Sequence, residues 1–158
     1  MIFVTLGTQA FSFDRLLRGL AGWSSDEELV VQGGASSFRP PGATWVDYLE
    51  YPELVEQVRR ARVVVSHAGV GSVITAVREG KRPIVVPRLY RFAEAVDDHQ
   101  LHFGRRLAGS GLVTLVEDPA ELRAAIEPDQ EPPRASGGAG GLVEDLRAYL
   151  EGVAAHSM

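Results

Sequence analysis

The stretch Val63-Val64-Val65-Ser66-His67-Ala68-Gly69-Val70-Gly71-Ser72 decides the fold of this chain. Its first three residues are apolar and β-branched, which predicts a buried strand. A short polar turn that contains glycine follows, and the pattern of residues 73–79 predicts a helix. A strand that enters a helix in this way leaves backbone N–H groups free at the positive end of the helix dipole, where phosphate groups commonly bind. The stretch therefore indicates a nucleotide-binding α/β domain.

The glycines of this turn allow a ligand to approach the backbone closely. Many strand–turn–helix units, however, use glycine only to turn the chain, so a short glycine loop is a weak signal by itself. The rest of the sequence has to support the interpretation.

The composition fits a single ordered domain and argues against nucleic acid as a partner. The 158 residues suffice for a domain with its own core, and 45% of them are hydrophobic. There is no cysteine, so disulfides and thiolate metal sites are excluded. The net charge of −5 and the scattered arginines do not form the basic face of a nucleic-acid-binding protein.

The sequence contains neither a leader pattern nor a membrane-spanning pattern. Residues 1–6 already predict a strand and lack the basic start of a signal peptide. No run approaches the roughly 20 apolar residues that a membrane-spanning helix needs. We therefore expect any contact with a membrane to be peripheral or to occur through a partner.

Strand and helix patterns alternate along the chain. Short apolar runs predict strands at 2–6, 29–32, 44–46, 63–66, 84–87 and 112–116. Helical patterns cover 13–20 with Ser12 as N-cap, 54–61 after Pro52, roughly 93–108 and 119–126. This alternation predicts an α/β fold, a Rossmann-like parallel sheet with helices on both faces.

Three polar segments follow strands of this predicted sheet: 7–9, 66–72 and the residues after Pro87. Because ligands of such sheets bind beyond the carboxyl ends of the strands, we expect these segments to surround one site. The domain should span 1–126. Residues 127–141 are rich in proline and glycine and predict a connector, and 142–155 predict a C-terminal helix that returns to the core or docks on a partner.

Five segments carry a family resemblance by their order and spacing. They are Phe3-Val4-Thr5-Leu6-Gly7-Thr8, Phe13-Asp14-Arg15-Leu16, Ser66-His67-Ala68-Gly69-Val70-Gly71-Ser72, Gly80-Lys81-Arg82-Pro83-Ile84-Val85-Val86-Pro87-Arg88 and Asp97-Asp98-His99-Gln100-Leu101. Together they resemble the donor-binding, C-terminal half of GT-B glycosyltransferases, the C-terminal domain type of glycosyltransferase family 28. The resemblance extends from Met1 to about Glu117.

Within this family the chain is most similar to the stand-alone subunits of bacterial exopolysaccharide glycosyltransferases and to the catalytic subunit of the eukaryotic dolichol-linked GlcNAc transferase. The resemblance implies an inverting hexosyltransferase that moves a sugar from a UDP-sugar to a lipid-linked glycan acceptor. It also implies a membrane-associated, acceptor-binding partner subunit, a cytoplasmic location at the inner face of the membrane through that partner, and no metal or other cofactor.

The resemblance assigns the donor diphosphate to two segments. These are Gly7 and Thr8 after the first strand, and the turn Ser66, His67, Ala68, Gly69, Val70, Gly71 and Ser72. Backbone N–H groups aimed at the leaving UDP would stabilise the charge that develops there. A protonated His67 would neutralise a phosphate. The alternative for His67 is a polar turn residue bonded to the backbone.

For the base and ribose, the resemblance points to Tyr48, Leu49 and Thr75. Tyr48, like Trp45 and Tyr51, can alternatively be a core aromatic residue. Fused relatives and the eukaryotic subunit have a glutamate that binds the ribose hydroxyls where this chain has Thr75. Because the bacterial exopolysaccharide subunits tolerate threonine there, Thr75 favours that branch.

The donor sugar is assigned to Asp98, His99 and Gln100, whose side chains can hydrogen-bond to vicinal hydroxyls. The alternative is a polar helix start with Asp97 or Asp98 as N-cap. A metal site at His99 and His102 lacks further ligands at suitable spacing, so no metal is expected.

Arg88 and Arg91 are candidates for contact with a pyrophosphate or uronic acid of the acceptor, or they are solvated loop residues. The apolar pair Tyr90 and Phe92 in the same loop suits a surface that faces a partner or lipid.

One nucleotide-type domain does not supply a general base for the acceptor hydroxyl, so we expect a half-site that needs its partner. Two alternatives remain: a non-catalytic nucleotide-sugar-binding regulatory module, and a relative of the nucleotide-sugar epimerases, which have both GT-B domains in one longer chain. Whether two copies pair when the partner is missing is left open.

Overall fold

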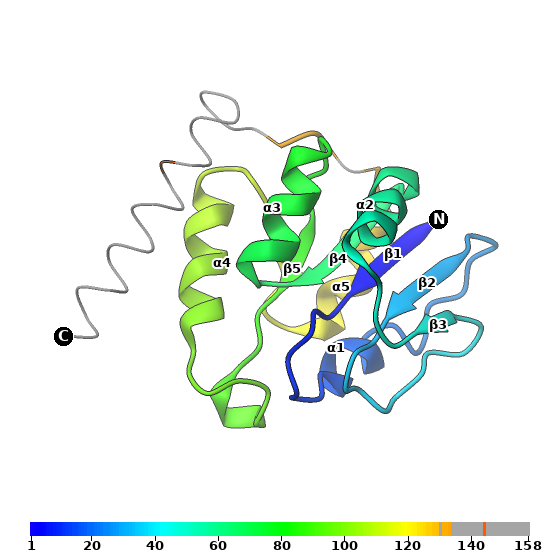
Figure 1. Cartoon of the computed structure of the whole chain (residues 1–158), viewed down its shortest axis with the longest axis horizontal. Coiled ribbons are helices and arrows are strands. Elements are labelled where there is room, and N and C mark those ends of the chain that lie inside the picture. Colours follow the sequence, from blue (N-terminus) through cyan, green and yellow to red (C-terminus); the bar gives the residue numbers. More distant parts are fainter. Residues whose placement is uncertain (130, 134–143, 145–158) are drawn as a thin grey trace.

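A parallel sheet forms the centre of the protein (Figure 1). The computed structural model describes residues 1–129, 131–133 and 144. In this part of the chain six strands hydrogen-bond in the order β3-β2-β1-β4-β5-β6, and all five pairings are parallel. The strands are β1 (Ile2–Thr5), β2 (Leu29–Gln32), β3 (Thr44–Val46), β4 (Val63–His67), β5 (Ile84–Val86) and β6 (Thr114–Leu115).

Helices cover both faces of the sheet, as predicted. They are α1 (Asp14–Arg18), α2 (Tyr51–Arg60), α3 (Val70–Arg78), α4 (His99–Gly109) and α5 (Leu122–Ile126), with short 3₁₀ turns η1 (Tyr90–Phe92) and η2 (Pro119–Glu121). Helices α1 and α5 pack on one face through Leu16 and Leu122. Helices α2, α3 and α4 pack on the other face, for example through Val58 and Phe103.

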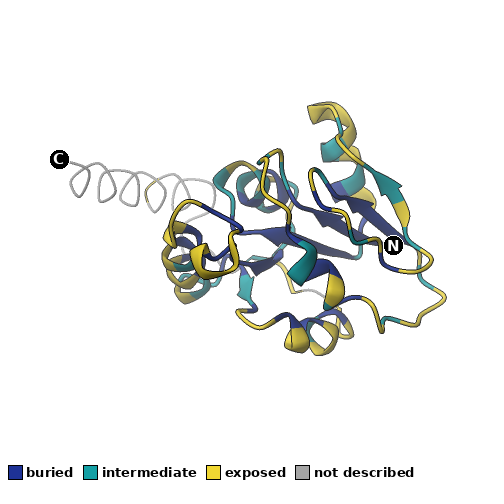
Figure 2. Ribbon diagram, turned by 90° about the horizontal axis from the view of Figure 1, so that it is seen from below, coloured by how far each residue is buried: buried dark blue, intermediate teal, exposed yellow. Residues whose placement is uncertain are grey.

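The strands are buried on both sides because successive side chains alternate between the two helical layers. Ile2 and Val4 belong to the core beneath α1 and α5, whereas Phe3 lies in the core beneath α2 and α3. In Figure 2 the dark blue of buried residues accordingly runs through the sheet, and yellow exposed residues lie on the helices and loops. This explains the nearly continuous apolar runs in the sequence.

The sheet order positions the site. Strand β1 pairs with β2 on one side and with β4 on the other, so the connections leave β1 and β4 in opposite directions across the sheet. In open α/β sheets such a reversal leaves a crevice beyond the carboxyl ends of the two strands. The segments that follow β1 and β4 therefore meet at this crevice.

Two predicted helix starts are wrong. The first helix has Phe13, not Ser12, as its N-cap, and the Phe13 N–H donates to Ser36 Oγ from a distant loop. The helix predicted at 93–108 begins only at His99. Residues 88–98 form an irregular loop with one 3₁₀ turn, because tertiary hydrogen bonds hold them there, as shown below.

The connector predicted at 127–141 lies mostly outside the described residues, and the helix predicted at 142–155 lies outside them apart from Glu144. Across the described ranges, no helix is both long enough and apolar enough to cross a membrane.

Candidate functional site

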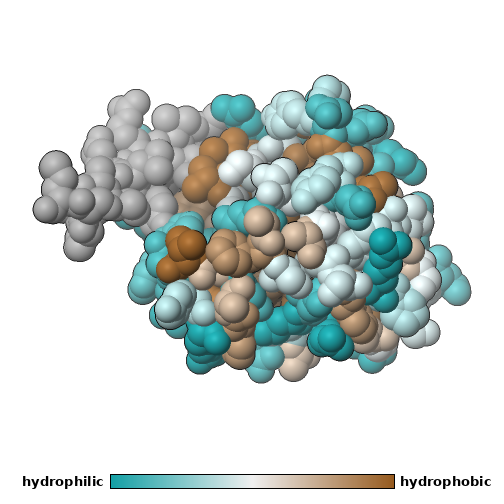
Figure 3. All heavy atoms as spheres, turned by 60° about the horizontal axis from the view of Figure 1, so that its bottom comes forward, coloured by the Kyte–Doolittle hydropathy of each residue, from teal (hydrophilic) through white to brown (hydrophobic). Residues whose placement is uncertain are grey.

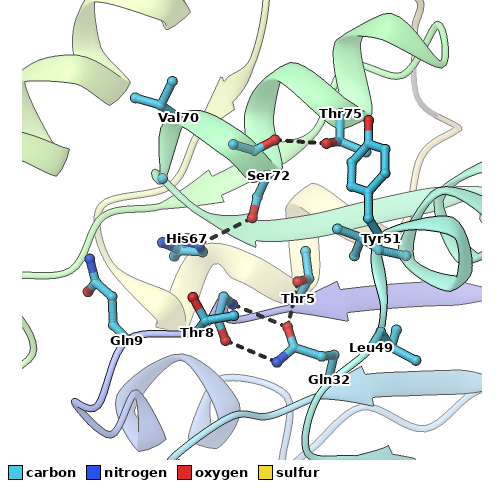
Figure 4. Close-up of a pocket in the computed structure, with 14 residues that line it drawn as sticks. Thr5, Thr8, Gln9, Gln32, Leu49, Tyr51, His67, Val70, Ser72 and Thr75 are labelled. Carbon is cyan, nitrogen blue, oxygen red and sulfur yellow. Dashed lines mark hydrogen bonds between the residues drawn. The ribbon is translucent and has the colours of Figure 1, made fainter.

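A cavity of about 380 Å³ opens at the crevice between the ends of β1 and β4. Its volume lies in the range of ligand pockets, roughly 300–1,000 Å³. The lining comes from β1 and its loop, from β2, from the start of α2 and from the turn into α3 (Figure 4). The lining residues are Thr5, Gly7, Thr8, Gln9, Gln32, Leu49, Tyr51, Leu54, His67, Gly69, Val70, Gly71, Ser72 and Thr75.

The structure brings the two predicted diphosphate segments together. Gly7 and Thr8 face the turn from His67 to Ser72 across the cavity, while Ser66 and Ala68 of the same turn are buried behind it. Gly69 is the N-cap of α3 and has no side chain to cap the helix. The first backbone N–H groups of a helix have no acceptor within the helix, so this end of α3 offers donors to the cavity.

The glycines of the turn have different roles. A Cβ atom on Gly69 would lie 2.0 Å from His67 Cε1, and one on Gly7 would lie 2.5 Å from His67 Nε2. A Cβ atom on Gly71 would meet nothing within 4 Å. The expectation that all these glycines serve the approach of a ligand is therefore corrected: Gly7 and Gly69 make room for the imidazole ring, and Gly71 leaves the cavity open.

His67 is neutral in the folded protein. Burial lowers the pKa of its imidazole from the ordinary 6.5 to about 3, and the nearby Arg88 guanidinium acts in the same direction. In the unliganded protein desolvation disfavours the imidazolium, so the protonated form of His67 is not present there; its role beside a bound phosphate stays a prediction. The ring instead has one N–H group, and its Nε2 lies 3.3 Å from Ser72 Oγ.

Gln32 lines the cavity and bonds to two of its loops, a role that was not predicted from the sequence. Its Oε1 accepts hydrogen bonds from Thr5 Oγ1 at 2.7 Å and from the Gly7 N–H at 3.2 Å. Its Nε2 donates to the carbonyls of Gly7 and Asp47. One amide thus ties the loop after β1 to the loop after β3. The signal was a glutamine at the end of an apolar strand, which identifies a buried polar group but not its partners.

Two of the three residues predicted for the base and ribose lie at the cavity. Leu49 and Thr75 line it, but Tyr48 does not and its side chain is exposed. Tyr51 and Leu54 line it instead. The Thr75 hydroxyl donates to the Gly71 carbonyl at 2.8 Å, so it can offer a ligand only its acceptor lone pairs.

The three residues predicted to contact the donor sugar lie elsewhere. Asp98 and His99 are exposed outside the cavity lining: Asp98 accepts from the Tyr90 N–H, and His99 bonds to Asp97. Gln100 is 1% exposed and lies behind His67, with Nε2 3.3 Å from His67 Nδ1. The alternative of a polar helix start is closer to what is seen, since Asp97 Oδ1 accepts from the His99 N–H.

Arg88 and Arg91 have opposite environments. Arg88 is 1% exposed, and its guanidinium donates to the carbonyls of Leu6, Phe11 and Glu94. Burial lowers the pKa of Arg88 to about 10, which still leaves it charged near pH 7. The prediction that Arg88 contacts the acceptor is corrected, because its charged end faces backbone inside the protein. Arg91 is exposed, stacked on Phe92.

An ion pair between Arg15 and Glu94 fixes the same loop. Arg15 donates twice to the carboxylate of Glu94, at 2.8 and 3.0 Å, and once to the carbonyl of Pro87. The Glu94 carboxylate also accepts from the Leu89 N–H. These contacts explain why residues 88–98 do not join the helix that follows.

The fixed loop presents apolar side chains to solvent. Tyr90 is 65% exposed, Phe92 49% and Val96 72%. With the bottom of Figure 1 turned forward, Figure 3 shows brown apolar residues interspersed with teal hydrophilic ones over the molecule. Within the described residues, no group of three or more His, Asp or Glu side chains is placed to hold a metal ion.

Comparison with known proteins agrees with this architecture. The profile of the glycosyltransferase family 28 C-terminal domain matches residues 1–136. The UDP-N-acetylglucosamine transferase subunit ALG13 of Yarrowia lipolytica is 37% identical over 67 residues, which are 42% of this chain and 32% of that protein. The subunit of the same name from Homo sapiens is 30% identical over 123 residues, 70% of this chain and 10% of that protein. The chain thus spans about a third and a tenth of these curated relatives.

Solved glycosyltransferases share the fold. The calicheamicin glycosyltransferase CalG4 aligns with a TM-score of 0.56 at 20% identity, over 94% of this chain and 37% of that one. SnogD from Streptomyces nogalater aligns with a TM-score of 0.54 at 21% identity, over 95% and 38%. The Rossmann-like sheet therefore corresponds to one part of these GT-B enzymes.

Proposed function

This chain belongs to the family of the glycosyltransferase family 28 C-terminal domain, and from that premise we propose that it is the donor-binding subunit of a UDP-sugar hexosyltransferase. The observation that carries the proposal is the cavity at the carboxyl ends of β1 and β4, with a neutral histidine, a serine and the start of α3 at its centre. These groups are arranged as hydrogen-bond donors for an anion.

The centre of the cavity suits a diphosphate. The N–H groups at the start of α3 and the hydroxyl of Ser72, which is bonded to His67, lie on one side, and the loop of Gly7 and Thr8 lies on the other. Among the residues that line the cavity there is no acidic side chain to repel a phosphate. The open space at Gly71 lets the ligand reach the helix backbone.

The two ends of the cavity suit the remaining parts of a UDP-sugar. Figure 4 places Leu49, Tyr51 and Thr75 at one end and Gln9 at the other. The apolar end favours the base, with the Thr75 oxygen as an acceptor for a ribose hydroxyl. At the opposite end Gln9 Oε1 is buried without a hydrogen-bond partner among the described residues, so it is ready to accept from a sugar hydroxyl.

In this proposal the chain assists departure of UDP. As the bond between the sugar and the diphosphate breaks, negative charge grows on the diphosphate, and the fixed donors of α3 and of Ser72, which His67 orients, stabilise it. We propose an inverting transfer, in which the acceptor hydroxyl attacks the opposite face of the sugar. The base that deprotonates this hydroxyl, like the acceptor site, would come from a second subunit.

We propose that this second subunit is membrane-associated and binds a lipid-linked glycan acceptor, which would hold the present chain at the cytoplasmic face of the membrane. Two observations support a partner. The two curated relatives are named as subunits of a UDP-N-acetylglucosamine transferase. The rigid loop 88–98 also exposes Tyr90 and Phe92 beside the exposed Arg91.

We place the reaction in the assembly of exopolysaccharides or related glycans. Thr75 supports this proposal. It lines the cavity at the position where the fused relatives and the eukaryotic subunit have the glutamate that binds the ribose hydroxyls, and where the bacterial exopolysaccharide subunits tolerate threonine. The same substitution predicts weaker binding of the ribose than in relatives with glutamate.

The proposal is tested by calorimetric titration with UDP, UDP-GlcNAc and UDP-glucose, with GDP-mannose as the comparison. The matched variants are Gly71→Leu, which projects a side chain at the cavity lining, and Gly109→Leu at the end of α4. Neither added Cβ meets an atom within 4 Å, so both variants should fold.

We expect the uridine ligands to bind to the wild type and to Gly109→Leu, and binding to Gly71→Leu to be lost. Equal binding of UDP to Gly71→Leu and to the wild type would contradict the placement of the ligand. Sugar transfer is then measured after addition of the acceptor subunit; binding without transfer in the assembled complex would indicate a regulatory module.

A further inference from the structure

Gln100 is a buried side chain that lies within hydrogen-bond distance of the His67 ring and does not line the cavity. It belongs to the first turn of α4, and it reaches past β5 to the end of β4. Its two amide atoms have different partners: Oε1 lies 3.1 Å from the Arg88 backbone nitrogen, and Nε2 lies 3.3 Å from His67 Nδ1.

The backbone group fixes the orientation of this amide. A backbone N–H can only donate, so the atom of Gln100 that faces Arg88 must be the carbonyl oxygen. The NH₂ group then faces His67, and an NH₂ group can only donate. His67 Nδ1 must therefore accept, which means that the proton of the neutral ring is on Nε2.

The remaining contact continues the chain toward the cavity. His67 Nε2 lies 3.3 Å from Ser72 Oγ, and the Ser72 hydroxyl has no other hydrogen bond among the described residues. Once its oxygen accepts from His67, its own proton is left for a ligand. Donors thus point one way, from Arg88 N–H through Gln100, His67 and Ser72 into the cavity, and each bond polarises the next.

We propose that Gln100 is a positioning residue: it holds His67 as the Nε2–H tautomer, which donates to Ser72 and thereby leaves the Ser72 proton to be donated to the diphosphate. The role in catalysis rests on the proposed function, whereas the tautomer does not. The Nδ1–H tautomer would reverse the chain, with the lone pairs of Ser72 turned toward the phosphate oxygens.

Charge in the surroundings supports a neutral ring. The charged group near His67 is the guanidinium of Arg88, whose own counter-ion Glu94 is held by Arg15. The ring is otherwise enclosed by Gly7 and Gly69, which carry no charge. The geometry of the hydrogen bonds then decides which nitrogen has the proton.

The first test is ¹⁵N NMR of the histidine rings in the full chain without ligand. Protonated and unprotonated ring nitrogens have well separated resonances, and loss of one set in His67→Asn assigns it. We expect a proton on Nε2 and none on Nδ1. A proton on Nδ1 in the wild type would overturn the proposal without any need for a Gln100 variant.

The second test is Gln100→Met, which keeps the length of the side chain and removes the donor to Nδ1. We expect the ring to populate both tautomers and UDP to bind about tenfold more weakly. Gln57→Met on α2, outside the cavity lining, is the matched control and should leave the His67 resonances and the UDP affinity unchanged. Unchanged His67 resonances in folded Gln100→Met would refute the positioning role.

The two proposals fail separately. If the wild-type chain does not bind UDP although the ring has its proton on Nε2, the proposed function falls and the assignment of Gln100 stands.

Discussion

The turn 66–72 and the segment 88–100, which is the loop 88–98 with the first two residues of α4, leave the same edge of the sheet, from the neighbouring strands β4 and β5, but they use their polar residues in opposite ways. The turn presents His67 and Ser72 to a cavity. The segment 88–100 directs Arg88 and Gln100 into the protein, where each is 1% exposed. The two segments have similar polar character in the sequence, so polarity alone does not separate groups that serve a ligand from groups that hold the site.

The difference follows from what surrounds each segment. The turn runs directly into α3, whose first N–H groups need acceptors that a ligand can supply. The loop has no regular structure over 93–98, so its shape depends on side chains that bond to its backbone. Arg88, Glu94 and Arg15 do this, and they connect the loop to the ends of β1 and β5.

The largest effect is expected from Arg88→Ala. This variant leaves the buried carbonyls of Leu6, Phe11 and Glu94 without their donor and Phe13 without its stacked guanidinium. We expect the free energy of unfolding in urea to fall by about 3–5 kcal/mol. Arg91→Ala in the same loop is the control, and since Arg91 is exposed its effect should stay within about 0.5 kcal/mol. Equal effects of the two variants would remove the contrast between them.

The next effect separates two glycines of the turn. In Gly69→Ala the new Cβ would overlap His67 Cε1, so we expect a loss of about 1–3 kcal/mol in stability and at least tenfold weaker binding of UDP. Gly71→Ala has open space and lies within α3, so it should stabilise the protein by about 0.5–1 kcal/mol. Thermal and urea unfolding measure both changes. A destabilised Gly71→Ala would mean that this glycine has a structural role as well.

A third prediction concerns pH. The folded pKa of His67 is about 3, below the ordinary 6.5, so the unfolded chain binds more protons between these values. Stability is therefore full above pH 6.5 and falls as the pH drops toward 3, with a loss of about 1–2 kcal/mol between pH 7 and pH 5. Urea unfolding at several pH values measures this slope. It should flatten in His67→Asn, and an unchanged slope in that variant would assign it to other groups.

Carboxylates change the stability only at lower pH, so their effect can be distinguished from that of His67. Hydrogen bonding to Arg62 lowers the pKa of Glu27 to about 2, so its contribution is present above the ordinary 4.5 and is lost as the pH falls toward 2. The loss of stability between pH 7 and pH 5 is therefore due to His67 more than to the Glu27–Arg62 pair.

The smallest effect on stability, and a clear one on binding, is expected from Ser72→Ala. The hydroxyl makes one long hydrogen bond within the protein, so the free energy of unfolding should change by less than about 1 kcal/mol. UDP should bind about tenfold more weakly, since a donor to a charged phosphate is lost. Titration calorimetry compares the UDP affinity of Ser72→Ala with that of Ser110→Ala at the end of α4, whose UDP affinity should equal that of the wild type.

Much of the fold could be predicted from short patterns. The β-branched run at 63–65 and its apolar counterparts led to the strands, because residues buried on both faces leave no polar alternation. Alternation of strands and helices led to a parallel sheet with two helical layers. The predicted ends of the helices were less accurate. Helix α4 begins only at His99, because the Arg15–Glu94 ion pair holds the preceding loop.

By itself the sequence determined the fold class, the family and the turn of the site, since these depend on local residue types and their spacing. Only the tertiary structure decided which polar side chains reach the cavity. Gln32 and Tyr51 were missed, and Gln100 and Arg88 were misassigned; Gln32, Gln100 and Arg88 bond to residues as far as 25, 33 and 82 positions away in the chain. Burial and hydrogen-bond direction are properties of such distant contacts, and no local pattern encodes them.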